Sequence, residues 1–275
     1  MKLTVLGARG SVPVSGKEYV LYGGETSCYM IEAGRFVIIL DAGTGILNVP
    51  GIKDDKEVVI LLSHFHIDHL IGLPFFGELM NKGRKITIYG RKTYGKTTKE
   101  QINGLFEKSY WPVTPFEFPS EVECIDQVFP LVLEEAGTLP VAENTSDGDI
   151  TIEAMNLNHP GGCLAFKISY MGQNIVYMTD CEIAEADIDR LSLFSRECDL
   201  LLCDSQYTTL EYETQKGFGH STIDMAVKLG EKSFSKKILL IHHDPYHTDE
   251  QLREMEESLD NKNVFMARAG MEIII

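Results

Sequence analysis

The stretch VVILLSHFHIDHLIG, residues 58–72, decides the fold: five apolar residues run directly into His64, His66, Asp68 and His69 within six positions. Such an apolar run is typical of a strand with both faces covered. Four ionisable groups at its end would be costly to bury unless a cation organises them, and imidazole nitrogen with carboxylate oxygen suits zinc, manganese or iron. The stretch therefore predicts a scaffold strand ending in a two-metal pocket, with His64 and His66 on one ion and Asp68 and His69 on its neighbour.

Length and charge narrow the class of protein. The chain has 275 residues, of which 44% are apolar, so it can bury a large core, and we predict one domain spanning residues 1–275. The net charge of −16, from 41 acidic and 25 basic residues, repels polyanions and anionic membranes. We therefore expect a small-molecule partner rather than nucleic acid or a membrane; the sequence leaves a homodimer open.

The cysteines and the N-terminus indicate the compartment. Six scattered cysteines without a Cys-x-x-Cys pair predict reduced, mostly buried thiols. The N-terminal MKLTVLGARG lacks the apolar run of roughly 7 to 15 residues of a signal peptide, and no stretch approaches the roughly 18 to 20 apolar residues of a membrane span. We expect a soluble, cytoplasmic protein.

Hydrophobic periodicity predicts an α/β fold with two sheets and outer helices. Thr248 stands three residues before Gln251, and Ser221 three before Asp224, which is capping-box spacing at two helix starts. Residues 109–149 are expected to be irregular. The predicted strands are 2–7, 28–33, 36–41, 58–63, 86–90, 150–158, 163–170, 174–180, 199–204, 237–243 and 272–275, and the predicted helices are 97–108, 184–195, 222–234 and 249–260.

The remaining histidines follow predicted strands or precede a helix. His159 follows one apolar strand, the pair His242 and His243 ends another, and His220 precedes a helix start, while Asp180 ends a further strand. Open α/β sheets place ligand sites at the carboxyl ends of their strands, so these side chains are expected to converge on the pocket. His247 is instead expected to be a turn or capping residue before the last helix.

Six short motifs occur in one order along nearly the whole chain. They are LDAGTG (40–45), SHFHIDHLIGLPFF (63–76), NHPGG (158–162), YMTD (177–180), GHST (219–222) and LIHHDPYHTD (240–249). With these motifs the chain resembles the metallo-β-lactamase-fold hydrolases, and within them the ribonuclease Z-like phosphodiesterase branch. The resemblance implies a four-layer αββα sandwich of two mixed sheets with outer helices and a site for two divalent ions, zinc or manganese, with iron as a third option.

The resemblance also assigns the ligands. The first ion would be held by His64, His66 and His159, the second by Asp68, His69 and the histidine after LLI, with Asp180 bridging both. The motif leaves His242 and His243 open, and we prefer His242 because it directly follows the apolar run. Asp41 would be a buried carboxylate that orients ligands. Gly161 and Gly162 are expected to permit a sharp turn after His159.

The predicted function is a binuclear metal-dependent phosphodiesterase for cyclic nucleotides or other small cyclic phosphodiesters. Asp68 would both bind metal and orient the nucleophile, and His220 would be the general acid that protonates the leaving alkoxide. Three aromatic residues ahead of His220 are candidates to stack on a base, although packing is the commoner role: Tyr207, Tyr212 and Phe218.

Four alternatives stay open. The same fold supports lactone, thioester and β-lactam hydrolysis. A tRNA 3′-processing endoribonuclease is disfavoured by the charge of −16 and by the lack of a long Gly/Pro-rich insertion. An oxygen-reducing di-iron protein would typically carry Glu at position 66, where this chain has His. A purely structural metal site would need four ligands, fewer than the seven positions offered here. The role of Glu25, where many similar chains have Asn, is also open.

Overall fold

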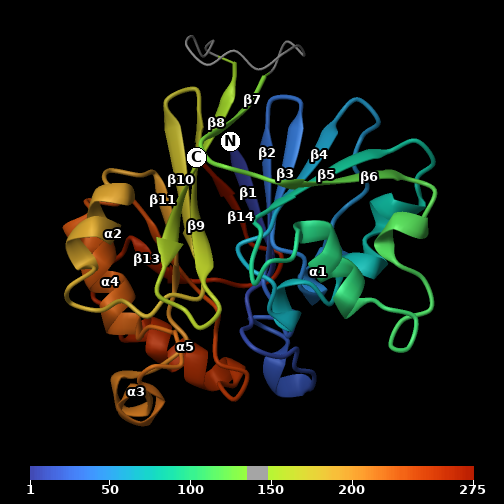
Figure 1. Ribbon diagram of the computed structural model, residues 1–275. Coiled ribbons are helices and arrows are strands. Elements are labelled where there is room, and N and C mark those ends of the chain that lie inside the picture. The colour runs from blue at the N-terminus through green and yellow to red at the C-terminus, as the bar shows by residue number, and fades with distance from the viewer. Residues whose placement is uncertain (135–147) are drawn as a thin grey trace.

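A computed structural model describes residues 1–134 and 148–275, and in them two β-sheets pack face to face with helices on both outer sides (Figure 1). The strands of the first sheet are β1 (Lys2–Gly7), β2 (Cys28–Ala33), β3 (Phe36–Leu40), β4 (Glu57–Leu61), β5 (Lys85–Gly90), β6 (Glu121–Asp126) and β14 (Glu272–Ile274). Those of the second are β7 (Leu131–Leu133), β8 (Ile150–Leu157), β9 (Cys163–Tyr170), β10 (Gln173–Met178), β11 (Leu200–Asp204), β12 (Ile238–Ile241) and β13 (Val264–Met266).

Both sheets follow the same plan. Over the described residues the strand orders are β14-β1-β2-β3-β4-β5-β6 and β13-β12-β11-β10-β9-β8-β7. In the first sheet β14, β1, β2 and β3 run antiparallel and β3 to β6 run parallel. In the second, β7 to β10 run antiparallel and β10 to β13 run parallel. Each sheet thus offers the carboxyl ends of several parallel strands as loop attachment points, where open α/β sheets carry their sites.

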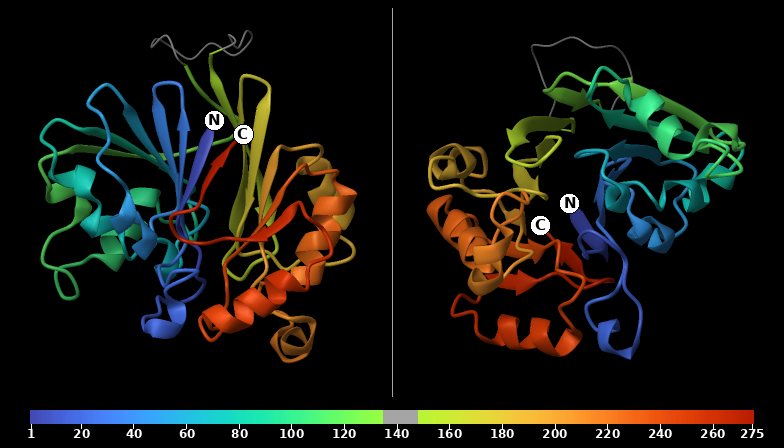
Figure 2. Two further views of the ribbon diagram at one scale, coloured as in Figure 1. Left: turned by 180° about the vertical axis from the view of Figure 1, so that it is seen from behind. Right: turned by 60° about the horizontal axis from the view of Figure 1, so that its bottom comes forward.

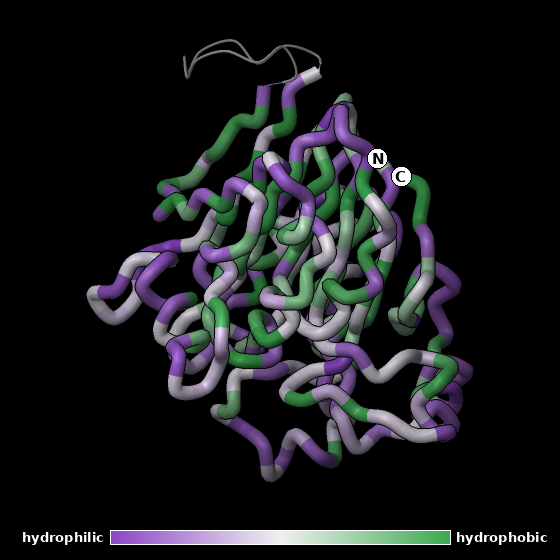
Figure 3. Tube along the Cα trace, turned by 90° about the vertical axis from the view of Figure 1, so that its right-hand side faces the viewer, coloured by the Kyte–Doolittle hydropathy of each residue, from purple (hydrophilic) through white to green (hydrophobic). Residues whose placement is uncertain are grey.

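Three apolar layers hold the sandwich together. The central layer lies between the sheets and joins side chains such as Leu3, Ile38 and Leu61 to Phe166, Tyr177 and Leu239. Two further layers lie under the helices on the outer faces. Figure 3 shows that the trace is mostly hydrophobic along the central strands and more hydrophilic toward the periphery. Because β3, β11 and β12 are buried along their whole length, the prediction of doubly covered strands is confirmed.

The helices cover the two outer faces, as the views from behind and from below show (Figure 2). The α-helices of the described part are α1 (Thr98–Leu105), α2 (Ile188–Phe194), α3 (Thr209–Gln215), α4 (Ile223–Lys232) and α5 (Asp249–Glu257). Short 3-10 segments are η1 (Lys17–Tyr19), η2 (Thr44–Asn48), η3 (Ile67–His69), η4 (Leu73–Phe75), η5 (Gly77–Met80) and η6 (Pro115–Glu117). Leu191, Leu229 and Leu252 anchor α2, α4 and α5 on the second sheet, and Ile102 anchors α1 on the first.

The predicted αββα sandwich is confirmed, with corrections to individual elements. The irregular stretch predicted for 109–149 contains η6, β6 and β7, while residues 135–147 lie outside the described residues. Thr248 and Gln251 form the predicted capping box. Thr222, not Ser221, caps α4: its Oγ1 accepts the Met225 amide at 3.1 Å, while the Ser221 hydroxyl accepts the Ile183 amide at 3.0 Å.

The cysteines agree with the expectation from sequence, whereas the four predicted helices are shorter than expected. All six cysteines are free, and all but Cys124 are buried. Burial raises the pKa of the Cys163 thiol well above its ordinary value, which favours the neutral form. Within residues 1–134 and 148–275, none of the helices combines the length and the apolarity that crossing a membrane requires.

Candidate metal centre

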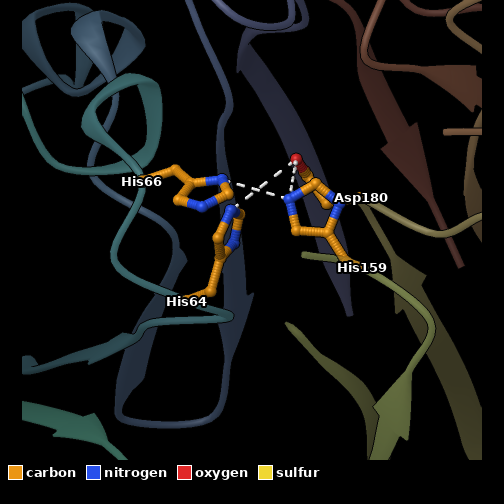
Figure 4. Close-up of side chains that lie close together, drawn as sticks. All are labelled: His64, His66, His159 and Asp180. Atoms are coloured by element: carbon orange, nitrogen blue, oxygen red, sulfur yellow. Dashed lines mark hydrogen bonds and ion pairs between the residues drawn. The ribbon is translucent and has the colours of Figure 1, made fainter. Parts of the chain in front are cut away.

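Four side chains from both sheets form the first cluster (Figure 4). His64 and His66 lie in the loop after β4, His159 in the turn after β8, and Asp180 follows β10. One ligand atom of each lies within 4.8 Å of the others. His66 Nδ1 is 3.1 Å from His159 Nε2, and Asp180 Oδ1 is 3.7 Å from His64 Nε2 and 3.5 Å from His159 Nε2. Figure 4 shows the three rings and the carboxylate pointing toward one another.

The second cluster joins Asp68, His69 and His242 on the other side of Asp180. Asp68 and His69 lie in η3, which begins directly after His66, and His242 directly follows β12. Asp180 Oδ2 is 3.0 Å from His69 Nε2 and 3.3 Å from His242 Nε2. The Asp68 carboxylate is 3.2 Å and 3.4 Å from the same two nitrogens. Asp180 therefore turns one oxygen toward each cluster.

The spacing and the hydrogen-bonding state of these atoms fit metal ions. Ligand atoms at about 2.0–2.1 Å from a tetrahedral zinc lie about 3.3 Å apart, close to the separations observed here. Nε2 of His64, His69 and His242 is buried and has no hydrogen-bond partner among the described atoms. These nitrogens face carboxylate oxygens at 3.0–3.7 Å without a well-aligned hydrogen bond, which is costly in a closed protein core but fits metal ions, since imidazole nitrogen and carboxylate oxygen are common metal ligands.

Asp41 supports the cage from behind. Its carboxylate is fully buried after β3 and accepts hydrogen bonds from the hydroxyls of Ser63 and Tyr177, each at 2.7 Å. It also lies 2.8 Å from His69 Nδ1, which leaves His69 Nε2 to face the cluster. Ser63 in turn lies 3.0 Å from His64 Nδ1. The carboxylate thus fixes two imidazoles from the sides that face away from the cluster.

The backbone is strained at four positions of the site. Ser11, Asp41, Asp180 and His242 have φ between 50° and 62° although none is glycine. Such conformations cost of the order of 1 kcal/mol and persist where the surroundings over-determine them. Asp41, Asp180 and His242 each follow a strand, so a left-handed residue turns the chain sharply at the sheet edge. Gly161 and Gly162 have φ of 84° and 81°, which confirms the predicted turn after His159.

Electrostatics differ between the two clusters. Burial lowers the pKa of His64, His66 and His159, so these rings are neutral, the form that binds metal. Burial opposes charge on the second cluster too, but the carboxylates outweigh it. They raise the pKa of His69 well above its ordinary value and that of His242 to about 9. The metal-free second cluster therefore holds protons at neutral pH.

His220 lies beside the second cluster and is held by a carboxylate. His220 precedes α4, its side chain is 10% exposed, and its ring stacks on that of His242 with centroids 4.8 Å apart. His220 Nδ1 is 2.8 Å from Asp204 Oδ2, at the end of β11, so Nε2 is the free ring atom. Asp204 also accepts the amides of Ser221 at 3.1 Å and Gln206 at 3.2 Å. The buried pair can hold and deliver a proton next to the cluster.

The loop before His220 is held by Glu182. Its carboxylate accepts the amides of Gly217 at 3.0 Å and Gly219 at 3.3 Å and the hydroxyl of Tyr212 at 2.7 Å. The Gly219 carbonyl is 3.0 Å from His159 Nδ1, and a β-carbon at Gly219 would lie 2.3 Å from that nitrogen. One loop therefore positions both His159 and His220.

Several residues singled out in the sequence lie elsewhere. His243 is buried against the carbonyl of Ala267 at 2.9 Å, outside both clusters, so the structure brings His242 rather than His243 to the cage. His247 closes the turn before α5, where its amide donates to the Asp244 carbonyl at 3.1 Å, and its ring lies 2.8 Å from Glu211; of the two expected roles the turn is confirmed, and the cap is Thr248. Glu25 accepts the amide of Gly24 at 3.1 Å. Of the three candidate stacking residues, Tyr207 is buried, Tyr212 bonds Glu182, and Phe218 is 59% exposed.

The sequence interpretation missed Asp204, Gln206 and Glu182. A signal for Asp204 was present, because LLLCD ends an apolar strand with Asp just as FVIILD and IVYMTD do at Asp41 and Asp180. Gln206 accepts from His242 Nδ1 at 3.0 Å and Glu182 holds a loop, and neither role has a local sequence pattern.

The fold and the two clusters that share one carboxylate define a class: metal-dependent hydrolases built on two facing mixed sheets. The Beta-lactamase superfamily domain matches residues 37–243, three quarters of the chain. The chain belongs to the metallo-β-lactamase superfamily, in the branch that includes YhfI and ribonuclease Z.

Three relatives illustrate this branch. The probable metallo-hydrolase YhfI of Bacillus subtilis (strain 168) is 25% identical over 284 residues, 98% of each chain, and its crystal structure gives a TM-score of 0.68 at 20% identity over 99% of this chain and 98% of that one. Ribonuclease Z of Pyrococcus abyssi is 25% identical over 79% of this chain and 80% of its own. A diphosphatase from the PhnP family gives a TM-score of 0.68 at 19% identity, covering 100% of this chain and 97% of that one.

Proposed function

We propose that the protein is a binuclear phosphodiesterase that hydrolyses cyclic nucleotides or other small cyclic phosphodiesters. The observation that carries this proposal is the buried His220–Asp204 pair beside the second cluster. An alkoxide leaving group from a sugar is strongly basic and needs a proton as the P–O bond breaks, which a positioned imidazole supplies. Similarity to ribonuclease Z and to a diphosphatase supports phosphorus chemistry.

We assign the ligands by the two clusters. His64, His66 and His159 would hold one ion, Asp68, His69 and His242 the other, and Asp180 would bridge them. Histidine with carboxylate suits zinc or manganese, and iron is a further option. Two such ions, when bound, supply Lewis-acid stabilisation of phosphoryl oxygens and lower the pKa of a coordinated water.

Side chains of the protein would orient the nucleophile, deliver the proton and bind the substrate. Asp68 accepts the Ser11 amide at 2.9 Å, which fixes one carboxylate oxygen and holds Asp68 in position to orient a nucleophile. Asp204 holds His220 by Nδ1, so that the proton leaves from Nε2. Phe218, exposed two residues before His220, offers an aromatic face on which a base can stack. The acidic chain favours a small substrate over a nucleic-acid polymer.

A substrate screen tests the proposal. The purified protein, loaded with zinc or with manganese, would be assayed against cyclic mononucleotides, cyclic dinucleotides and an aryl phosphodiester. A lactone, a thioester, a β-lactam and a precursor tRNA would be run in parallel. We expect cleavage of at least one small phosphodiester. Turnover of a carbon ester or of the tRNA alone would reassign the reaction, and two bound ions without any turnover would favour a structural centre.

The role of His220 can be isolated with a matched control. His220→Ala should slow hydrolysis of an unactivated alkyl diester by ~10² to 10⁴-fold and that of a nitrophenyl diester far less, because nitrophenolate leaves without a proton. His247→Ala is the control, since it removes another buried imidazole that is paired with a carboxylate, Glu211, outside the cage. Equal slowing of both substrates by His220→Ala would exclude the proton-donor role.

A further inference from the structure

A basic loop lies at the rim of the metal centre. The loop after β5, residues 91–97, carries Arg91, Lys92 and Lys96 and no acidic residue, in a chain of net charge −16. β5 pairs with β4, which leads into the His64–His69 loop. A β-carbon on Gly90 would lie 3.1 Å from the ring of Phe65, so the start of this loop lies against the loop that carries the metal ligands.

Arg91 lies on the turn that carries His159. A β-carbon on Gly162 would lie 2.4 Å from Nη2 of Arg91, so the guanidinium covers the backbone of this turn. A β-carbon on the adjacent Gly161 would lie 3.5 Å from the Tyr94 hydroxyl and 3.6 Å from His66 Nε2. The basic loop, the glycine turn and a candidate metal ligand therefore meet at one place on the rim.

The charge of Arg91 is not compensated within the described residues. Its Nη1 donates to the neutral side chain of Asn156, and no carboxylate of residues 1–134 or 148–275 lies within 4.0 Å of the guanidinium. Arg190 offers an internal comparison, because it also reaches Asn156, donating to its carbonyl at 2.7 Å, but it is paired with Asp187 at 3.0 Å. Asn156 thus holds two arginines, and of these two Arg91 is the one without a carboxylate partner in residues 1–134 and 148–275.

We propose that Arg91 binds a second phosphate group of the substrate, so that the preferred substrate is a small phosphodiester carrying a further phosphate. The inference rests on the phosphodiesterase function proposed above and narrows its substrate class. A guanidinium presents a planar fork of donors that matches phosphate oxygens, and Asn156 occupies only one side of it. Tyr94, whose side chain is 83% exposed, adds a hydroxyl donor at the same rim.

A purely structural role for Arg91 makes a different prediction. If Arg91 only fastened the loop to β8 through Asn156, its removal would weaken all substrates alike. A phosphate-binding role predicts that the loss depends on the second phosphate. The discriminating pair is a dinucleotide with and without a 5′-phosphate, pApA and ApA; both contain the same scissile diester and serve as open-chain analogues of a cyclic phosphodiester.

The experiment compares the metal-loaded wild type with Arg91→Ala, Arg91→Lys and the control Arg190→Ala. We expect the wild type to have a lower KM for pApA than for ApA. Arg91→Ala should raise KM for pApA by about tenfold or more and leave ApA within about twofold, the loss expected for one charge-assisted contact. Arg91→Lys should recover part of the difference, and Arg190→Ala should retain it.

Binding separates failure of this inference from failure of the proposed function. Isothermal titration calorimetry would measure pApA and ApA binding to the same four proteins, whether or not either dinucleotide is cleaved. Tighter binding of pApA that is lost in Arg91→Ala supports the phosphate site even if no diester is hydrolysed. Equal binding of both dinucleotides to the wild type, or an equal loss in Arg190→Ala, would overturn it.

Discussion

Asp41 and Asp180 occupy equivalent places in the two sheets and do different work. Each follows the strand that joins the antiparallel to the parallel part of its sheet, β3 or β10, and each is buried with positive φ. Asp41 contacts Nδ1 of His69, which points away from the cluster, and two hydroxyls, while Asp180 faces ring nitrogens of both clusters. The same backbone position supports ligands in one half and supplies a candidate ligand in the other.

The halves also differ in how their site residues are spread along the chain. The first half supplies four side chains from one loop, His64 to His69. The second supplies one side chain from each of several strand ends or loops, among them His159, Asp180 and His242. A compact motif is therefore informative in sequence, whereas a dispersed set depends on the topology that brings strand ends together.

The largest expected effect is at the carboxylate that the halves share. Asp180→Asn keeps the side-chain shape but removes the charge and replaces one oxygen by an amide nitrogen. We expect loss of at least one ion per chain and a fall in turnover of about 10³-fold, since several kcal/mol of charge stabilisation depend on the ions. Metal content and turnover would be measured together. The control is Asp199→Asn, which removes a carboxylate bonded to Lys236 away from the cage; two retained ions in Asp180→Asn would contradict a bridging role.

The two supporting carboxylates should separate metal binding from proton delivery. Asp41→Asn should weaken metal affinity by about 10 to 100-fold, because Asp41 orients His69 and Ser63. Asp204→Asn should chiefly slow the unactivated diester, because Asp204 holds His220. Competition against a chelator and turnover of two leaving groups would be measured on both variants. If Asp41→Asn and Asp204→Asn changed metal affinity and leaving-group dependence in the same way, the two carboxylates would not have separate roles in metal binding and proton delivery.

Metal affinity should rise with pH because of the second cluster. In the metal-free protein the pKa of His69 lies well above its ordinary value and that of His242 is about 9, so both rings are charged at neutral pH. Both rings must lose a proton to bind metal. For each proton released, the metal affinity should therefore increase by about tenfold per pH unit, up to about pH 9. Calorimetry in buffers of different ionisation enthalpy would count the protons released. No proton release at pH 7 would contradict this assignment.

The smallest expected effect is on the hydroxyl that links the two sheets at Asp41. Tyr177→Phe removes one hydrogen bond of 2.7 Å from β10 to the carboxylate after β3. We expect the free energy of unfolding to fall by about 1 to 3 kcal/mol and Tm by a few degrees, because the buried carboxylate of Asp41 loses a hydrogen-bond donor. Tyr170→Phe, at the half-buried end of β9, is a control for the loss of a hydroxyl. An unchanged Tm would show that Ser63 and His69 satisfy Asp41 alone.

The features that could be predicted from the sequence are the local ones, and the features that were missed depend on contacts between distant parts of the chain. The buried strands and the His64–His69 loop were predictable because apolar runs and a dense motif are local. The strands missed were short or at sheet edges: β6 and β7 carry exposed residues, and β13 has three residues. Helix α3 has no buried residue and therefore no apolar periodicity. Asp204 stood alone after its strand, and only the stacking of α4 against the sheet brings His220 to it.

Three imidazoles form a parallel pile: His242 lies between His69, at 5.6 Å, and His220, at 4.8 Å, with both neighbours tilted by only 16°. Substitution of His242 removes more than one candidate metal ligand, because the rings of His69 and His220 both lose the ring on which they stack. Replacing His242 and His220 together should therefore reduce turnover by less than the two single substitutions would predict if they acted independently. A double-mutant cycle over this pair would measure the coupling free energy between the candidate metal ligand and the candidate proton donor.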